Sequence, residues 1–326
     1  MTEPRSDGDT VVFVNPSARK GRSSGRTTEA LEALAHFSPR TALPRVLDTR
    51  SVAELHDCAA EEVERGAARI VVVGGDGLAH HVVQAVAGSD TVLGIIPVGT
   101  GNDLAGALGL PRQPTEAARV ALGPDRHIDL LRCGGTWALS VATTGFSAAV
   151  NERAEAMSWP RGASRYSLAT LLELPRLRPA GLVLSLESDG GGPPVEHRVR
   201  AALVAVGNTA LFGGGMRICP AADPADGVLD ITVIDAVGRL DLMRHFRRVF
   251  GGTHIHHPAV SVYRATAITL EATEAGRVPV RADGEAWGEL PCRIEAVPRA
   301  LRIAAPANAP ANAPATTPAT TPATTR

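Results

Sequence analysis

Lysine is almost absent from this chain of 326 residues: Lys20 is the only one, and the other 32 of its 33 basic residues are arginine. Schiff-base enzymes, P-loop nucleotide-binding proteins and protein kinases each need a lysine at a defined motif position. Lys20 lies in the segment Asn-Pro-Ser-Ala-Arg-Lys-Gly, which fits none of these motifs. The sequence therefore excludes these three classes.

An excess of one charge, closely spaced cysteines and long apolar runs are also missing. The 33 basic residues balance 34 acidic ones, and a net charge of −1 argues against a dedicated nucleic-acid binder. The cysteines Cys58, Cys133, Cys219 and Cys292 show no CxxC spacing, which is typical of a reduced protein without a zinc or disulfide framework. No apolar run approaches the roughly 20 residues of a membrane span, and the polar N-terminus lacks a signal-peptide pattern. We therefore expect a cytoplasmic protein without a transmembrane segment, and peripheral contact with a membrane stays open.

The first third of the chain alternates short β-branched runs with helical patterns. Strands are expected at residues 11–14, 46–49, 70–73 and 92–96, and helices at 26–37, 54–65 and 80–86. Ser51 and Glu54 form a capping-box pattern at the start of the second helix. This alternation predicts a doubly wound parallel α/β domain over residues 10–132.

The pattern changes after residue 129 to short strands separated by Gly, Pro and Asp turns. These strands are expected at residues 137–143, 181–187, 200–206, 229–234, 260–263, 267–270, 278–281 and 293–297. Helical stretches interrupt them near residues 166–174 and 240–250. We therefore expect an antiparallel β-rich domain over residues 133–304. Residues 305–326 are Pro-Ala-Asn and Ala-Thr-Thr-Pro repeats with almost nothing to bury, so this tail is expected to be disordered.

A glycine-rich loop, Gly74-Gly75-Asp76-Gly77-Leu78, follows the third expected strand. Its glycines would let backbone amides approach a phosphate, and the next helix adds a favourable N-terminal field. An aspartate beside polyphosphate needs a magnesium ion, water or ribose hydroxyls as an intermediary. A tight strand–helix turn is the alternative interpretation.

A second loop, Pro97-Val98-Gly99-Thr100-Gly101-Asn102-Asp103, follows the next expected strand. It offers backbone amides, a hydroxyl and an acid, and it would share one crevice with the first loop. Together the two loops predict a site for nucleotide phosphates.

The third element is distant in sequence: Arg281-Ala282-Asp283-Gly284-Glu285. An acid pair across a glycine is often only a hairpin turn. Beside two phosphate-binding loops it fits phosphoryl transfer, in which a carboxylate accepts the proton of the attacking hydroxyl.

The ordered motifs resemble the diacylglycerol-kinase catalytic-domain family, which includes bacterial soluble lipid kinases, ceramide kinases and sphingosine kinases. The resemblance runs from Val11 to about Ala305. It rests on these segments: Asn15-Pro16-Ser17, Thr49, the two loops, Gly145-Phe146, 213–216 (Gly-Gly-Gly-Met), Asp226-Gly227-x-x-Asp230 and 282–285 (Ala-Asp-Gly-Glu).

The resemblance implies a two-domain, ATP-dependent lipid kinase with its nucleotide in the cleft between the domains. The catalytic residues it implies are Glu285, Asp283 and Asp76, with Glu285 as general base. The residues expected to bind ATP are Asn15, Thr49, Gly74, Gly75, Asp76, Gly77, Leu78, Ala79, His80, Gly99, Thr100, Asn102 and Asp103. A structural Mg²⁺ would be held by Asp223, Asp226 and the carbonyl of Val228, in a turn whose acids suit a hard cation, although a solvated turn without an ion is the alternative.

Three positions depart from the family pattern. Leu78 replaces a hydroxyl residue common in diacylglycerol-type members, while His81 and Ser147 stand where acids are usual. A histidine at position 81 would either donate to phosphate or pack within the helix.

We therefore predict transfer of the γ-phosphoryl group of ATP to a hydroxyl of diacylglycerol or a related lipid at a membrane surface. A kinase for a soluble acceptor such as NAD, and a catalytically silent nucleotide- or lipid-binding regulator, are the alternatives. No nucleic-acid partner is expected, and a homodimer stays open.

Overall fold

The computed structural model describes residues 9–14, 24–99, 101–145, 179–236 and 246–306, together with residues 150, 153, 156, 157, 168, 169, 172 and 238. Asn15, Lys20, Thr100, Phe146 and Ser147, and the tail from residue 307 onwards, lie outside the described residues. Most of the helix expected at 166–174 and the first part of that expected at 240–250 also lie outside them.

The first half of the chain alternates strands with helices. Its elements are β1 (Thr10–Val14), α1 (Ser24–Phe37), β2 (Arg45–Leu47), α2 (Val52–Glu64), β3 (Arg69–Gly74), α3 (Asp76–Val86), β4 (Val92–Pro97), α4 (Asp103–Ala107), α5 (Pro114–Ala121) and β5 (Asp125–Cys133). Strands β2, β1, β3 and β4 pair in parallel in that order, which confirms the doubly wound sheet.

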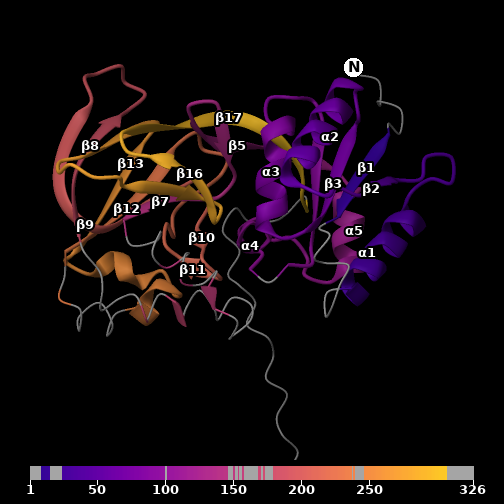
Figure 1. Ribbon diagram of the computed structural model, residues 1–326, viewed down its shortest axis with the longest axis horizontal. Helices are drawn as coiled ribbons and strands as arrows, with labels where there is room; N and C mark the ends of the chain where they lie inside the picture. Colours follow the sequence, from indigo (N-terminus) through magenta and orange to yellow (C-terminus); the bar gives the residue numbers. More distant parts are fainter. Residues whose placement is uncertain are drawn as a thin grey trace, which may run out of the picture.

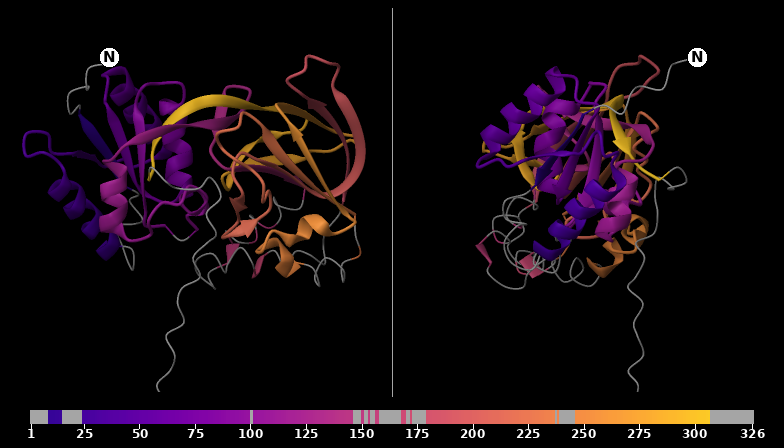
Figure 2. Two further views of the ribbon diagram at one scale, coloured as in Figure 1. Left: turned by 180° about the vertical axis from the view of Figure 1, so that it is seen from behind. Right: turned by 90° about the vertical axis from the view of Figure 1, so that its right-hand side faces the viewer.

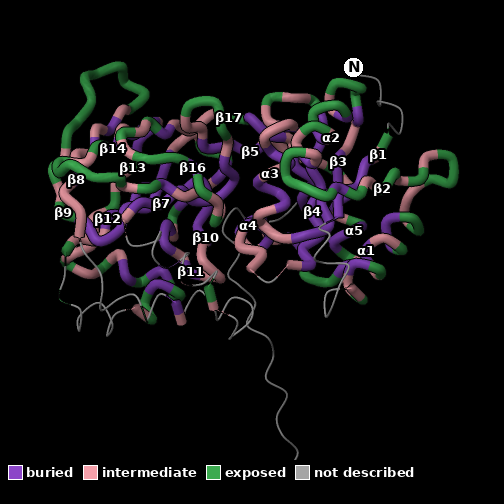
Figure 3. Tube along the Cα trace, viewed as in Figure 1, coloured by how far each residue is buried: buried purple, intermediate pink, exposed green. Residues whose placement is uncertain are grey.

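Helices cover both faces of this parallel sheet (Figure 1). Alternate residues of β1 point to opposite faces: Val11 and Phe13 pack in one apolar cluster with α2 and α3, and Val12 and Val14 pack in another with α1 and α5. Buried strands therefore run through the middle of this half, with exposed positions on the outer helices (Figure 3). A sheet covered on both faces explains why its strands are continuous apolar runs.

The start of α2 follows the predicted capping box. The backbone amide of Glu54 donates to Ser51 Oγ over 3.1 Å. The Glu54 carboxylate in turn accepts from the amide of Arg50, one residue before the cap. This pairing fixes the segment Thr49–Ser51 at the edge of the candidate site described below.

The second half is built mainly of antiparallel strands. Its elements are β6 (Thr136–Ala138), β7 (Val141–Gly145), β8 (Ala180–Glu187), β9 (Val195–Gly207), β10 (Leu211–Phe212), β11 (Met216–Arg217), β12 (Leu229–Asp235), β13 (Val260–Ala265), β14 (Ala267–Ala272), β15 (Pro279–Ala282), β16 (Glu285–Glu289) and β17 (Cys292–Ala304), with 3₁₀ turns at Phe246–Val249 and Thr253–His256. The antiparallel ladders confirm the expected β-rich second half.

Strand β17 connects the two halves. Its first residues pair with β14, while Arg302 and Ile303 pair in parallel with Val92 and Leu93 of β4. Strand β5 runs antiparallel beside it for most of its length. The β17 ribbon arches from one half to the other in Figure 1 and again from behind in Figure 2. The domain boundary at residue 133 stays a prediction, but the last strand of the chain completes the sheet of the first half.

One predicted strand is broken in the structure. Residues 137–143 were expected to form a single strand, but β6 ends at Ala138 and β7 begins at Val141. The amides between them, those of Leu139 and Ser140, donate to the carboxylate of Asp283 instead of to a neighbouring strand. A long-range contact has thus overridden the local strand pattern.

Candidate active site

The two glycine-rich loops touch each other at the ends of neighbouring strands. Val98 and Gly99 donate their amides to the carbonyl of Gly74 over 3.0 and 3.2 Å. A Cβ placed on Gly99 would lie 2.7 Å from the Cα of Gly75, which is closer than real side chains come. The glycines are therefore required by the close approach of the two backbones. Val98 and Gly99 do not supply open amides, contrary to what the sequence suggested.

Asp76 joins the first loop to helix α4. Its two carboxylate oxygens accept from the backbone amides of Asp103, over 2.9 Å, and Leu104, over 3.2 Å. Burial of the carboxylate, and after it the nearby charge of Asp103, raise the pKa of Asp76 to about 7 against the opposing effect of the two amides. In this arrangement Asp76 holds the second loop and α4 in place.

Asp103 continues this chain of contacts toward the glycine-rich turn between β10 and β11. Its carboxylate oxygens accept from the amides of Gly214 and Gly215, each over 2.7 Å. Burial raises the pKa of Asp103 as well. Asp76 and Asp103 thus connect three loops that are far apart in the sequence.

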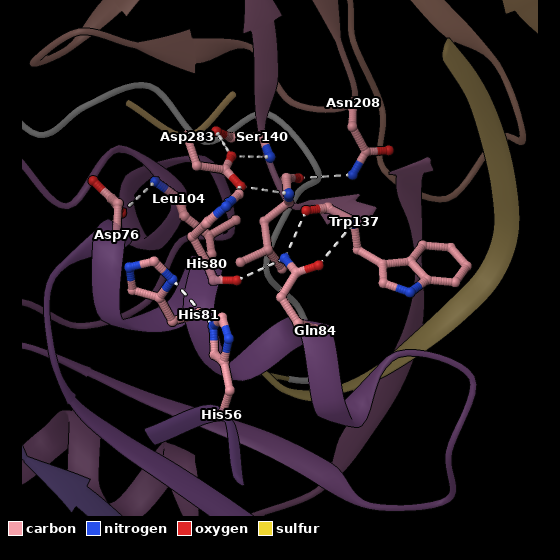
Figure 4. Close-up of polar contacts among 11 residues, drawn as sticks. His56, Asp76, His80, His81, Gln84, Leu104, Trp137, Ser140, Asn208 and Asp283 are labelled. Carbon is pink, nitrogen blue, oxygen red and sulfur yellow. Dashed lines mark hydrogen bonds and ion pairs between the residues drawn. The ribbon is translucent and has the colours of Figure 1, made fainter. Parts of the chain in front are cut away.

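Asp283 occupies the tight turn between β15 and β16. Its φ of +54° and that of Gly284, +91°, suit the Asp-Gly hairpin turns in which both central residues have positive φ. The Asp283 carboxylate accepts from the amides of Leu139 and Ser140, from Ser140 Oγ and from Nδ1 of His80 at 2.9 Å (Figure 4). The segment is both a hairpin turn and part of the candidate site.

These contacts control the charge of Asp283. Burial alone would raise its pKa, but the hydrogen bond and charge of His80, with the Ser140 and Leu139 donors, hold the pKa below its usual range. Asp283 is therefore a buried, fully hydrogen-bonded carboxylate that fixes the hairpin against the first half of the chain.

Glu285 begins β16 and lies in a different environment from Asp283. Its side chain reaches the first turn of α3, because a Cβ placed on Gly77 would lie 3.1 Å from Glu285 Oε1. It lines an open pocket of about 350 Å³ with residues from the starts of α2 and α3. The other lining residues are Thr49, Arg50, Ser51, Val52, Leu55, Gly75, Gly77, Leu78 and His81. The pocket thus combines two helix N-termini, a hydroxyl, an arginine and a carboxylate.

The departures from the family pattern have structural consequences. Leu78 packs over Gly74, whose added Cβ would lie 2.8 Å from Leu78 Cδ2, and it is buried in the core of the first half. His81 is half-buried, and its Nδ1 lies 3.3 Å from Nε2 of His56 (Figure 4). Burial lowers the pKa of His81, and its histidine neighbours lower it further, while Glu285 opposes the shift. His81 therefore faces the pocket as well as packing in its helix.

The structure adds residues that the motifs did not indicate. Gln84 donates to the carbonyls of His80 and Trp137 and accepts from the amide of Trp137, which ties α3 to β6 (Figure 4). Asn208 donates to the carbonyls of Asp129 and Leu139. These side chains hold the segment that carries the Asp283 contacts. Neither belongs to a motif, so only the fold brings them to the site.

The turn predicted to hold Mg²⁺ lies apart from this pocket. Asp223 and Asp226 accept from the amides of Ala225 and Val228, and Asp226 also pairs with Arg264. Nearby Asp230 is buried, and neither of its oxygens has a hydrogen-bond partner among the described residues; burial raises its pKa. Among all the residues that the structure describes, no group of three or more His, Cys, Asp or Glu side chains is arranged to hold a metal ion.

The predicted site residues therefore fall into separate groups. Thr49, Gly75, Gly77, Leu78 and Glu285 line one pocket. Asp76, Asn102, Asp103 and Asp283 support it through partly buried hydrogen bonds, as does His80. Gly74 and Ala79 are sequence neighbours of these residues at the first loop. The turn at residues 223–228, which was predicted to hold Mg²⁺, lies in the second half, away from the pocket.

Comparisons with known proteins cover most of the chain. The family model described as "Diacylglycerol kinase catalytic domain" matches residues 9–133, and that described as "YegS C-terminal NAD kinase beta sandwich-like domain" matches residues 140–305. A diacylglycerol kinase of Mycobacterium tuberculosis is 38% identical over 311 residues, covering 92% of this chain and 96% of the relative. A protein of Chromohalobacter salexigens named "Probable lipid kinase YegS-like" is 31% identical over 312 residues, covering 92% and 94%.

Solved structures show the same fold. The crystal structure of a diacylglycerol kinase from Bacillus anthracis superposes with a TM-score of 0.71 at 22% identity, covering 93% of this chain and 98% of the other. Both halves of the chain, and their arrangement, therefore match a fold that is already known from crystal structures.

Proposed function

The chain belongs to the diacylglycerol-kinase catalytic-domain family and is a lipid kinase, and from this premise we propose that it transfers the γ-phosphoryl group of ATP to a hydroxyl of diacylglycerol or a related lipid. One observation carries the proposal: the carboxylate of Glu285 stands against the first turn of α3, in a pocket also bordered by the start of α2. A proton acceptor and a phosphate-binding helix terminus thus share one space.

In this proposal the first turn of α3 and the segment Thr49–Ser51 bind the donor nucleotide. Amides at a helix N-terminus have no partner within the helix, and the helix dipole favours an anion there. Gly77 leaves room between α3 and the Glu285 carboxylate. Arg50 lines the same pocket and adds a positive charge for a triphosphate. The chain therefore binds phosphate without a motif lysine.

Glu285 would accept the proton of the lipid hydroxyl while the hydroxyl oxygen attacks the γ-phosphorus and the bond to the β-phosphate oxygen breaks. Asp283 is a positioning residue in this proposal, because its four donors leave it no free role at the reacting atoms. It fixes the turn from which Glu285 projects. The proton acceptor and the positioning residue are thus one glycine apart.

Magnesium belongs to the proposal in two places. A Mg²⁺ ion bound with ATP would neutralise charge on the phosphates. A structural ion would be held by Asp223, Asp226 and the carbonyl of Val228, and the buried carboxylate of Asp230, whose oxygens accept no hydrogen bond from the described residues, supports an oxygen-rich cation site there. Arg264 balances part of this negative charge in the structure.

An assay of labelled ATP with a lipid panel in mixed micelles, with products identified by mass spectrometry, tests the proposed reaction. We expect phosphorylated diacylglycerol or a close analogue. Glu285→Gln should lower kcat by about 10²- to 10⁴-fold, the usual contribution of a general base, and leave thermal unfolding unchanged. Glu289→Gln is the matched control, because Glu289 is exposed on the same strand and pairs with Arg277, so its kcat should be that of the wild type.

Three results would contradict the proposal or one of its parts. Product with a soluble acceptor and none with any lipid would assign a different substrate, and ATP binding without any transfer would indicate a regulator. Full activity of Glu285→Gln would remove the role assigned to this residue.

A further inference from the structure

Two of the four cysteines lie side by side in the sheet. Cys133 is the last residue of β5 and Cys292 is the first residue of β17. These strands run antiparallel, with Cys133 directly opposite Ile294. Residues two apart on a strand point to the same face, so Cys292 is the diagonal neighbour of Cys133 on that face. Both side chains pack, half-buried, against the same apolar cluster as Ile294.

The proximity of the two thiols gives them different acidities. The contact with Cys292 lowers the pKa of Cys133 to about 7, although burial opposes this shift. The same contact and burial raise the pKa of Cys292. The other cysteines differ: burial and surrounding acids raise the pKa of Cys58, and burial raises that of Cys219 to about 12. Cys133 is thus the cysteine with the most thiolate near neutral pH.

The position of the pair allows the sulfurs to approach further. A disulfide needs Cα atoms within about 7 Å, and diagonal neighbours lie about 7–8 Å apart, so the bond requires a small movement of the backbone. Both cysteines stand at strand ends, and Cys133 leads into the turn Gly134-Gly135. An added Cβ on either glycine would meet no atom within 4 Å, so no packed side chain of the described residues covers the tip of this turn, and at its base Thr136 Oγ1 donates to the carbonyl of Cys133. A disulfide between the two cysteines therefore requires a local movement of this uncovered turn.

We propose that Cys133 and Cys292 form a reversible intramolecular disulfide when the protein meets a low-molecular-weight disulfide as oxidant. The Cys133 thiolate attacks one sulfur of the oxidant and releases one small thiol, which leaves a mixed disulfide. The Cys292 thiol then loses its proton, attacks Cys133 Sγ and releases the second small thiol. The protein loses two protons and two electrons, and one oxidant molecule takes them up and becomes two thiols.

The disulfide would tie together two segments that lead into the candidate site. Residues 136–140 follow Cys133 and carry the Trp137 contact with Gln84 and the two amides bound to Asp283. Cys292 follows strand β16, which begins at Glu285. Oxidation should therefore restrain the β5–β6 turn and slow amide hydrogen exchange there. This inference is independent of the substrate of the kinase.

Oxidation of the full-length protein with glutathione disulfide at neutral pH tests the proposal. We expect the loss of one pair of free thiols, a mass lower by two hydrogens, and a tryptic peptide linking Cys133 to Cys292 that dithiothreitol releases. Hydrogen exchange over residues 134–140 should be slower in the oxidised form. Cys58→Ser is the matched control, in which the linked peptide should still form.

Cys133→Ser and Cys292→Ser complete the test, with circular dichroism confirming that each variant is folded. Neither should form the linked peptide, and Cys292→Ser should stop at a glutathione adduct on Cys133. Four results would overturn the proposal: four free thiols after oxidation, adducts on both cysteines without a link, a link involving Cys58 or Cys219, or unchanged exchange in the turn.

Discussion

The two acids of the β15–β16 turn show how environment separates residues of one type. Asp283 is buried, accepts from backbone, hydroxyl and imidazole donors, and has a pKa below its usual range. Glu285, one glycine further along, projects into an open pocket against α3. The sequence motif indicated that both acids matter. The resemblance assigned the general-base role to Glu285, but the sequence could not show that Asp283 is held by its donors, because two of them come from residues 139 and 140, which read locally as strand.

Asp76 makes the stability of the fold depend on pH. Its pKa of about 7 in the folded chain lies far above the value near 4 of an exposed aspartate. Between these values the folded chain binds more protons than the unfolded chain. The free energy of unfolding contributed by Asp76 should therefore fall as pH rises from about 4 to about 7 and then level off. The change is on the order of a few kcal/mol, since one pKa unit corresponds to about 1.4 kcal/mol.

Urea denaturation of Asp76→Asn and of the wild type across this pH range measures the effect. The variant cannot ionise at this position, so its unfolding free energy should fall less steeply between about pH 5 and 7. Asn also replaces one acceptor oxygen with a donor, so the variant should be less stable than the wild type at the acidic end. Parallel curves for the two proteins would show that Asp76 does not titrate in this range.

At the scale of elements, the candidate site depends on how closely two loops approach each other. Both loops were predicted from their glycines and their positions after neighbouring strands, and the sheet places them together as expected. What the sequence could not show is that several of their amides bind the protein. Gly74 O and the Asp76 carboxylate accept three of them, together with the amide of Leu104 in α4, so the second loop supports the first.

Gly99→Ala tests this contact directly. Its Cβ would meet the Gly75 Cα at 2.7 Å and Asn102 Oδ1 at 2.9 Å, so one of the backbones must move. We expect a loss of about 1–3 kcal/mol of stability, as for overpacked cores, and weaker nucleotide binding. Urea denaturation and calorimetric titration with ATP measure the two effects.

Gly25→Ala is the control for this substitution. Gly25 lies within α1 with no atom near an added Cβ, so alanine should raise stability slightly through helix propensity. Nucleotide affinity should not change in this variant. If Gly99→Ala behaves in the same way as Gly25→Ala, the close approach of the loops does not constrain the site.

At the scale of the whole molecule, the order of elements along the chain hides how the halves are joined. The change from alternating helices and strands to short strands correctly predicted two different sheet types. It divided the chain near residue 133, yet β17 returns from the second half to pair with β4 and β5. The local sequence does not predict this pairing, because the apolar run of β17 is the same whichever strand lies beside it. No helix among the described residues is long and apolar enough to cross a membrane.

This return of β17 predicts that the two halves do not fold separately. Leu301 and Ile303 are fully buried in the core of the first half, and Ala305 donates to the carbonyl of Pro124. A chain ending at Pro306 retains all these contacts and should match the full chain in thermal unfolding and kinase activity. A chain ending at Pro298 loses them and exposes one side of β4 and β5. This shortened chain should therefore not unfold cooperatively. The same is expected of a fragment that ends at residue 133, the predicted domain boundary. Cooperative unfolding of the Pro298 chain, followed by circular dichroism, would show that the first half is an autonomous domain and that β17 only covers it.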